Sequence, residues 1–197
     1  MLKNYFCASL LFFLFCCTLV DAEDYNSAFD KGTWDIRVWG GGGGVLHGSR
    51  KDTQLLISGL GFGKHLSRIH GNGVFRGSFE YAVEVIPLFV VFQQTTRTSG
   101  FAFTPLLMKW DCLRTNGLPR MFLEIGAGMA FTSSQVPIGA SRFNFTPQTG
   151  IGFYFASRTN RAASLELKYI HVSNAGLNHH NPGINTVDIL LGFHWFH

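Results

Sequence analysis

A histidine and a serine stand two residues apart in the stretch YIHVSNAGLNHHNPGIN, residues 169–185. A serine hydroxyl is a weak nucleophile until a neighbouring base, often an imidazole, takes its proton. His171 and Ser173 are therefore suited to acyl transfer if both side chains lie on one side of the backbone. The charge that develops on an attacked carbonyl oxygen needs fixed donors. Asn174 and the backbone N–H groups near Gly176 could supply them.

The residues before this pair indicate which way the two side chains point. Leu165, Leu167 and Tyr169 are apolar, whereas the residues between them are charged. This alternation predicts a strand with one apolar face. Alternate side chains of a strand project to the same side, roughly 6–7 Å apart. His171 and Ser173 therefore continue the apolar face, within reach of each other.

The same alternation recurs along the chain and predicts eight strands. The fourth and the sixth contain Pro105 and Pro147, which indicate a bulge or an interruption. The glycine-rich residues 40–51 resemble a phosphate-binding loop only superficially, because the Lys-Ser/Thr pair of such a loop is missing. They are interpreted as a flexible loop. The predicted strands are residues 33–40, 54–65, 75–90, 100–110, 120–131, 141–155, 164–173 and 186–196.

The composition is unusual for a soluble domain. Charged residues make up 14%, aromatic residues 15%, and 23 residues are glycine, yet no long apolar segment follows residue 22. Such a chain fits a β-barrel, which satisfies its backbone hydrogen bonds inside a lipid bilayer. We therefore predict an all-β fold, an eight-stranded antiparallel transmembrane β-barrel; a secreted β-sandwich is the alternative. Eight strands leave a lumen that side chains fill, so no pore is expected.

The chain begins with a pattern typical of an export signal. A positive residue, Lys3, precedes an apolar run that ends at Val20, and small residues precede residue 23. We predict a signal peptide over residues 1–22 and the barrel over residues 23–197. Cys112 is then the one remaining cysteine, which excludes an internal disulfide. The formal charge of +4 is modest, and we expect no nucleic-acid partner.

The last predicted strand has a continuous apolar face. Val187, Ile189, Leu191, Phe193 and Trp195 form this face, and Asp188, Gly192 and His194 lie on the other. An apolar last strand with terminal aromatic residues resembles the assembly signal of outer-membrane barrels. The expected location is therefore the bacterial outer membrane.

The stretch HVSNAGLNHHNPGIN resembles the signature of the PagL-type lipid A 3-O-deacylases, and GFAFTPLLMKW and FNFTPQTGIGFYF resemble strands of that family. The resemblance implies an eight-stranded outer-membrane barrel with its active site on the lipid-exposed wall. It also implies hydrolysis of the 3-linked ester of lipid A, the lipopolysaccharide anchor of the outer leaflet, without a cofactor. By the same resemblance, His171 is the general base and Ser173 the nucleophile, with Asn174 and Gly176 at the oxyanion.

One position departs from the family pattern. Asn185 stands where the best-known members have a glutamate that orients the histidine. Asn185 shares the apolar face of the last strand and is expected across the hairpin from His171. An asparagine can orient an imidazole, as in Cys-His-Asn sites, but cannot offset its positive charge. A serine esterase and a non-catalytic structural or adhesin-like barrel are therefore the first two hypotheses, and a different acyl-ester hydrolase or acyltransferase on the same wall is the third. His179 and His180 lack regular ligand spacing, and no metal is expected.

Overall fold

The computed structural model of the chain describes residues 24–45, 52–113, 120–158, 160–178 and 180–197. The predicted signal peptide lies outside these residues. Nearly all of the described chain is strand, with two short 3-10 helices, η1 (Asp24–Phe29) and η2 (Gly73–Phe75). The strands are β1 (Trp34–Val45), β2 (Gln54–His65), β3 (Gly77–Phe92), β4 (Arg97–Cys112), β5 (Met121–Val136), β6 (Ser141–Phe145), β7 (Gln148–Arg158), β8 (Arg161–Val172) and β9 (Ile184–Phe196).

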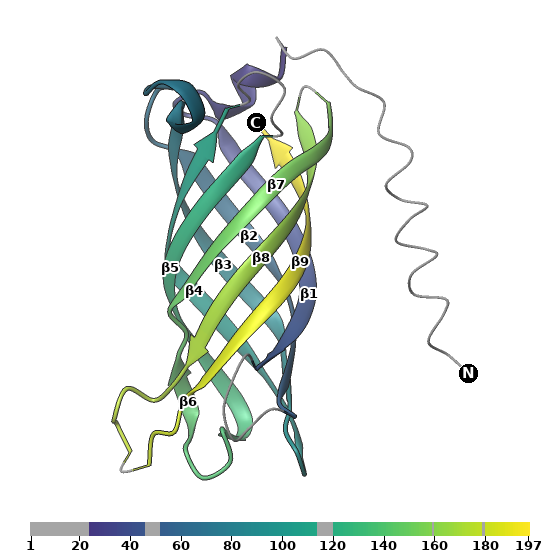
Figure 1. Cartoon of the computed structure of the whole chain (residues 1–197), viewed down its shortest axis with the longest axis vertical. Helices are drawn as coiled ribbons and strands as arrows, with labels where there is room; N and C mark the ends of the chain where they lie inside the picture. Colours follow the sequence, from purple (N-terminus) through teal and green to yellow (C-terminus); the bar gives the residue numbers. More distant parts are fainter. Residues whose placement is uncertain (1–23, 46–51, 114–119, 159, 179) are drawn as a thin grey trace, which may run out of the picture.

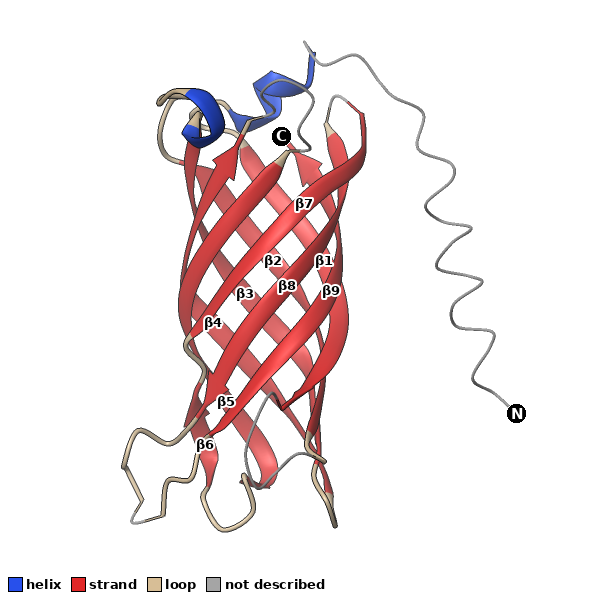
Figure 2. Ribbon diagram, viewed as in Figure 1, coloured by secondary structure: helices blue, strands red, loops and turns tan. Residues whose placement is uncertain are grey.

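These strands form one closed antiparallel barrel (Figures 1 and 2). Sequence neighbours other than β6 and β7 pair with each other, β1 also pairs with β9, and the β4–β5 pairing closes the sheet. β6 and β7 both pair with β5, so together they occupy one strand position, interrupted at Pro147. The predicted eight-stranded barrel is thereby confirmed. No helix among the described residues is both long and apolar enough to cross a membrane.

The alternation of side chains separates an apolar outer wall from a polar interior. On β5, Leu123 and Ile125 are 41% and 57% exposed, whereas the alternate residues Phe122 and Glu124 are 1% and 3% exposed. β8 shows the same pattern. Exposed aliphatic side chains suit lipid, since a charged Lys or Arg facing the middle of a bilayer costs about 2–4 kcal/mol. The predicted inward and outward faces are therefore confirmed.

The glycine-rich segment after Trp39 differs from the prediction. β1 continues through Gly40–Gly44 to Val45, so these glycines are strand rather than loop. A Cβ atom at Gly43 would overlap the carbonyl oxygen of Val187 in β9. The absence of side chains lets β1 approach its neighbour closely, which is a recognised use of glycine within strands. Residues 46–51 of the predicted loop lie outside the described part of the chain.

Pro105 and Pro147, the two prolines at which the sequence predicts an irregularity, coincide with irregular pairing. The register between β4 and β5 shifts between Phe103 and Leu106, around Pro105. Pro147 separates β6 from β7. Proline has no N–H to donate to the ladder, so a bulge or a break is the expected response. The predicted irregularities are confirmed.

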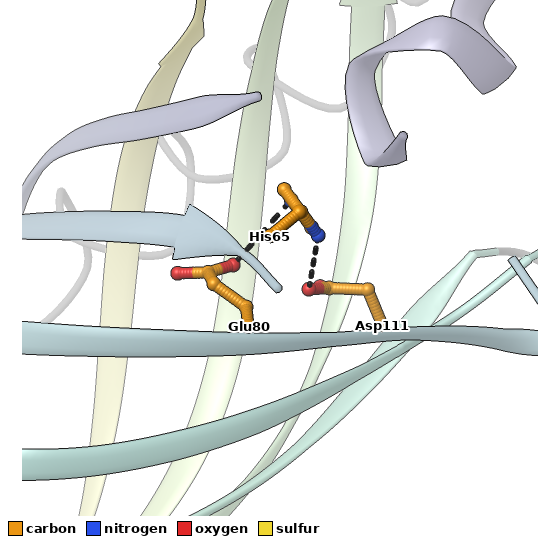
Figure 3. A group of neighbouring side chains, drawn as sticks. All are labelled: His65, Glu80 and Asp111. Atoms are coloured by element: carbon orange, nitrogen blue, oxygen red, sulfur yellow. Dashed lines mark ion pairs between the residues drawn. The ribbon is translucent and has the colours of Figure 1, made fainter. Parts of the chain in front are cut away.

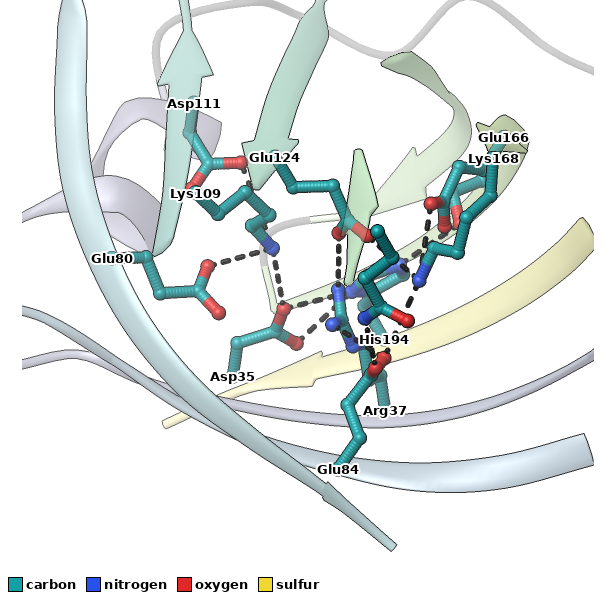
Figure 4. A network of polar contacts seen from close by, with 12 residues as sticks. Asp35, Arg37, Glu80, Glu84, Lys109, Asp111, Glu124, Glu166, Lys168 and His194 are labelled. Atoms are coloured by element: carbon teal, nitrogen blue, oxygen red, sulfur yellow. Dashed lines mark hydrogen bonds and ion pairs between the residues drawn. The ribbon is translucent and has the colours of Figure 1, made fainter. Parts of the chain in front are cut away.

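Side chains fill the barrel interior in layers. Near the C-terminal end of the barrel, Phe29 of η1 packs with Phe122, Tyr154 and Phe196 in an apolar cluster. Further along lies a network of buried charged side chains, drawn in Figure 4. A second apolar cluster, which contains Trp39, occupies the other end. The interior is therefore packed, as predicted for eight strands.

Candidate active site

The candidate site lies on the outer wall, where β8 and β9 form a hairpin at the end of the barrel away from the C-terminus (Figure 1). His171 is the penultimate residue of β8, and Asn185 is the second residue of β9. The two are direct partners in the β8–β9 ladder. The expected position of Asn185 across the hairpin from His171 is therefore what the structure has.

Asn185 holds the imidazole of His171 through its side-chain oxygen. His171 Nδ1 lies 2.6 Å from Asn185 Oδ1, and the hydroxyl of Tyr169 donates to the same oxygen at 2.8 Å. An amide oxygen can only accept hydrogen bonds. The proton of a neutral imidazole is then on Nδ1, which leaves Nε2 as the acceptor that a general base requires. The contact from Tyr169 could not be predicted from the sequence, because Tyr169 belongs to an apolar row.

Ser173 follows directly on the end of β8. It forms an isolated bridge with Phe145 of β6, through backbone hydrogen bonds of 2.7 and 3.1 Å. The residue is only 8% exposed, so it is more enclosed than its position on an outer face implies. Within the described chain, no hydrogen bond joins His171 to Ser173. In catalytic pairs this contact is often long and tightens when substrate binds.

Asn174 organises the loop that follows the serine. Its backbone N–H donates to Asn181 Oδ1 at 3.0 Å, and its side-chain amide donates to the carbonyl of His180 at 3.1 Å. Its own Oδ1 accepts from the N–H of Gly176 at 2.9 Å. Ala175, between them, has a left-handed backbone with φ of +53°. The groups predicted to bind an oxyanion thus hold one another in the loop, and the oxyanion role of Asn174 and Gly176 stays a prediction.

The far end of the loop also touches the site. A Cβ atom at Gly183 would lie 3.1 Å from Cε1 and 3.7 Å from Nε2 of His171. Asn178 donates to the carbonyl of Ala140 at 2.9 Å, which ties the loop to the turn between β5 and β6. The Asn-Pro-Gly segment indicates a turn, but the contact of Gly183 with the imidazole could not be predicted from the sequence.

Comparison with known proteins places this site in a family. The family model for lipid A 3-O-deacylase (PagL) matches residues 89–194, which is more than half of the chain and includes every candidate site residue. The chain belongs to the lipid A 3-O-deacylase (PagL) family. The match also covers β4–β8 and β9 up to residue 194, the strands that carry the site and the wall next to it.

Two solved structures are similar to this chain, and the first of them supports the fold. The crystal structure of the outer membrane enzyme PagL superposes with a TM-score of 0.54 at 20% sequence identity, covering 80% of this chain and 97% of that one. The crystal structure of OprG from Pseudomonas aeruginosa, an outer membrane protein, gives a TM-score of 0.49 at 11% identity, covering 85% and 97%. Comparison with curated protein sequences finds no match.

Another polar cluster lies inside this family member, remote from the hairpin. His65, Glu80 and Asp111 place one potential metal-ligand atom each within 4.8 Å of the others (Figure 3). Lys109 occupies the same place, with its Nζ 2.6 Å from Glu80 Oε2 and 3.7 Å from Asp111 Oδ1. The ammonium supplies the positive charge that these carboxylates need, so we interpret the cluster as part of the buried network. His179 lies outside the described residues.

Proposed function

We propose that this protein is a serine esterase of the bacterial outer membrane that removes the 3-O-linked acyl chain of lipid A. Family membership supports the substrate class. The observation that carries the proposal is the hydrogen bond between His171 Nδ1 and Asn185 Oδ1. It leaves His171 Nε2 able to accept the proton of Ser173, which is two residues further along the chain. The three residues lie on the hairpin of one outer wall, where an ester held in lipid can reach them.

The proposed chemistry proceeds through an acyl-enzyme. Ser173 Oγ attacks the ester carbonyl while His171 Nε2 takes its proton, which forms a tetrahedral intermediate. Donors of the Asn174–Gly176 segment stabilise the oxyanion. The intermediate collapses, the sugar oxygen leaves, and the imidazolium returns the proton to it. Water, deprotonated by the same imidazole, then cleaves the acyl-enzyme and releases the fatty acid together with the free serine.

The position of the site suits a substrate that stays in the membrane. Leu165 and Leu167, on the same face of β8, are 43% and 49% exposed. Leu177, in the loop after the serine, is 71% exposed. This apolar wall can contact the acyl chains of a lipid, so the ester reaches Ser173 without leaving the outer leaflet.

Asn185 favours a second candidate function, a non-catalytic structural or adhesin-like barrel. The amide is neutral, so it cannot offset the charge of the imidazolium that forms when Ser173 attacks. In that case the hairpin would retain the family geometry without turnover.

The two functions are distinguished by lipid A from bacteria that express the protein. By mass spectrometry, we expect lipid A to lose its 3-linked acyl chain in bacteria with the natural protein. We expect it to retain that chain in bacteria with Ser173→Ala or His171→Ala. Heat-modifiable electrophoretic mobility of each variant shows that the barrel has folded. Ser133→Ala, an exposed serine on β5, is the matched control and should retain activity. Unchanged lipid A with the natural protein would favour the non-catalytic barrel.

A further inference from the structure

Two side chains of β8 meet on one oxygen atom of β9. Asn185 Oδ1 accepts the hydroxyl of Tyr169 at 2.8 Å and faces His171 Nδ1 at 2.6 Å. Tyr169 and His171 are alternate residues of one strand, and Asn185 is the cross-strand partner of His171. Tyr169 is 36% exposed on a wall of apolar side chains. Its hydroxyl is therefore directed at the group that orients the histidine.

An amide and a carboxylate differ in what they offer an imidazole. A glutamate presents an acceptor oxygen whichever way it turns, whereas an asparagine has an acceptor at one end and a donor at the other. If the Asn185 amide turned by half a rotation, its Nδ2 would donate to His171 Nδ1. The imidazole proton would then lie on Nε2, where it blocks transfer from Ser173. An asparagine at this position therefore needs something that selects its orientation.

Tyr169 supplies such a selection. A phenol is a stronger hydrogen-bond donor than acceptor, because an oxygen lone pair is partly delocalised into the ring. The amide orientation that turns Oδ1 towards the phenol is therefore favoured over the one that turns Nδ2 towards it. We propose that Tyr169 is a positioning residue that holds the Asn185 amide with Oδ1 towards His171 and thereby keeps His171 in the tautomer that can act as a base. This role rests on the proposed function of the hairpin.

A double-mutant comparison of deacylation rates tests this role. Tyr169→Phe should lower the rate about fivefold to tenfold when Asn185 is present, which corresponds to the net value of one hydrogen bond. In the Asn185→Glu background the same change should have no effect, because a carboxylate accepts from His171 in either orientation. A purely structural role for Tyr169 would instead give the same loss in both backgrounds, and that result would overturn the proposal.

The matched control is another tyrosine on the outer wall. The hydroxyl of Tyr81 donates to the carbonyl of Pro105 at 2.6 Å and has no contact with the hairpin among the described residues. Tyr81→Phe therefore removes one exposed phenol and one hydrogen bond without touching the site. It should leave the rate unchanged in both backgrounds.

A second measurement reads the tautomer without any turnover. In full-length protein labelled with nitrogen-15 histidine, in detergent micelles at alkaline pH, the His171 ring signals are identified by their loss in His171→Ala. We expect the imidazole proton on Nδ1 in the natural protein and in the double variant Tyr169→Phe/Asn185→Glu. In Tyr169→Phe alone, we expect the tautomer population to shift towards a proton on Nε2. A tautomer that does not respond to Tyr169→Phe, or a proton on Nε2 in the natural protein, would refute the proposal. An inactive protein whose tautomer responds would refute the proposed function alone.

Discussion

Gly183 lies against the edge of His171 that accepts the serine proton in the proposed mechanism. It has a left-handed backbone, with φ of +56°, and any side chain there would contact Cε1 and Nε2 of the imidazole. The contact is tight, since the nearest ring atom would lie 3.1 Å from a Cβ. This edge of the imidazole is therefore accessible because position 183 has no side chain.

Gly183→Ala should lower the deacylation rate about 10- to 100-fold, since a displacement of roughly 1 Å at a catalytic group costs that much. Gly73→Ala is the matched control, because Gly73 has φ of +57° and nothing within 4 Å of its Cβ position. Both variants incur the backbone strain of about 1–2 kcal/mol for a left-handed residue. Steady-state rates on lipid A should be lower for Gly183→Ala than for Gly73→Ala. Equal rates would contradict the contact with His171.

At this scale the sequence predicts positions better than contacts. Parity predicted that His171 and Asn185 face each other, because the side-chain period of a strand is two. The hydrogen bond of the Tyr169 hydroxyl could not be predicted, because an aromatic residue in an apolar row is also typical of a wall that only faces lipid. The partners of Asn174 also could not be predicted, because they depend on how the loop folds over itself.

At the scale of elements, the β8–β9 hairpin depends on how β1 packs against β9. Gly41 and Gly43 lie against the backbone of Ile189 and Val187, in the part of β9 that follows Asn185. Glycine usually indicates turns, which explains why the sequence suggested a loop here. In the structure the missing side chains permit close approach of two strands. The strands with clear alternation, such as β5 and β8, were predictable because one face packs in the interior and the other faces outward. Each position therefore requires either an interior or an outward-facing residue type.

Gly43→Ala should destabilise the barrel by about 1–3 kcal/mol, the usual cost of overpacking, because its methyl group meets the β9 backbone. Gly44→Ala is the control, since the nearest atom to its Cβ position is the carbonyl oxygen of Thr53 at 3.6 Å. Urea titration of the folded barrel in detergent, followed by tryptophan fluorescence, compares the two. Equal midpoints would show that β1 does not approach β9 as closely as described.

At the scale of the whole molecule, buried ion pairs join strands from opposite walls of the barrel (Figure 4). Lys168 of β8 places its Nζ 2.7 Å from Glu124 Oε1, 3.2 Å from Glu166 Oε1 and 3.7 Å from Glu84 Oε1. Its side chain is 1% exposed. Removing this cation would leave Glu166 without its ion pair and would leave Glu84 and Glu124 with Arg37 alone.

Lys168→Met should therefore lower the free energy of unfolding by about 3–5 kcal/mol, as for one broken partner of a buried ion pair. Lys64→Met is the control: Lys64 lies on the outer side of β2, 4.8 Å from the ring of Trp34. Losing that contact should cost less than about 1 kcal/mol. The same urea titration measures both, and a small effect of Lys168→Met would contradict the role of the network.

The most direct test of the central claim uses purified protein reconstituted with lipid A that carries its 3-linked acyl chain. Tandem mass spectrometry of the lipid identifies which chain is lost, and the released fatty acid is measured in the same sample. The proposed function predicts loss of the 3-linked chain alone, an equal amount of fatty acid, and neither product with Ser173→Ala. Loss of a different chain, or the same loss with Ser173→Ala, would contradict it.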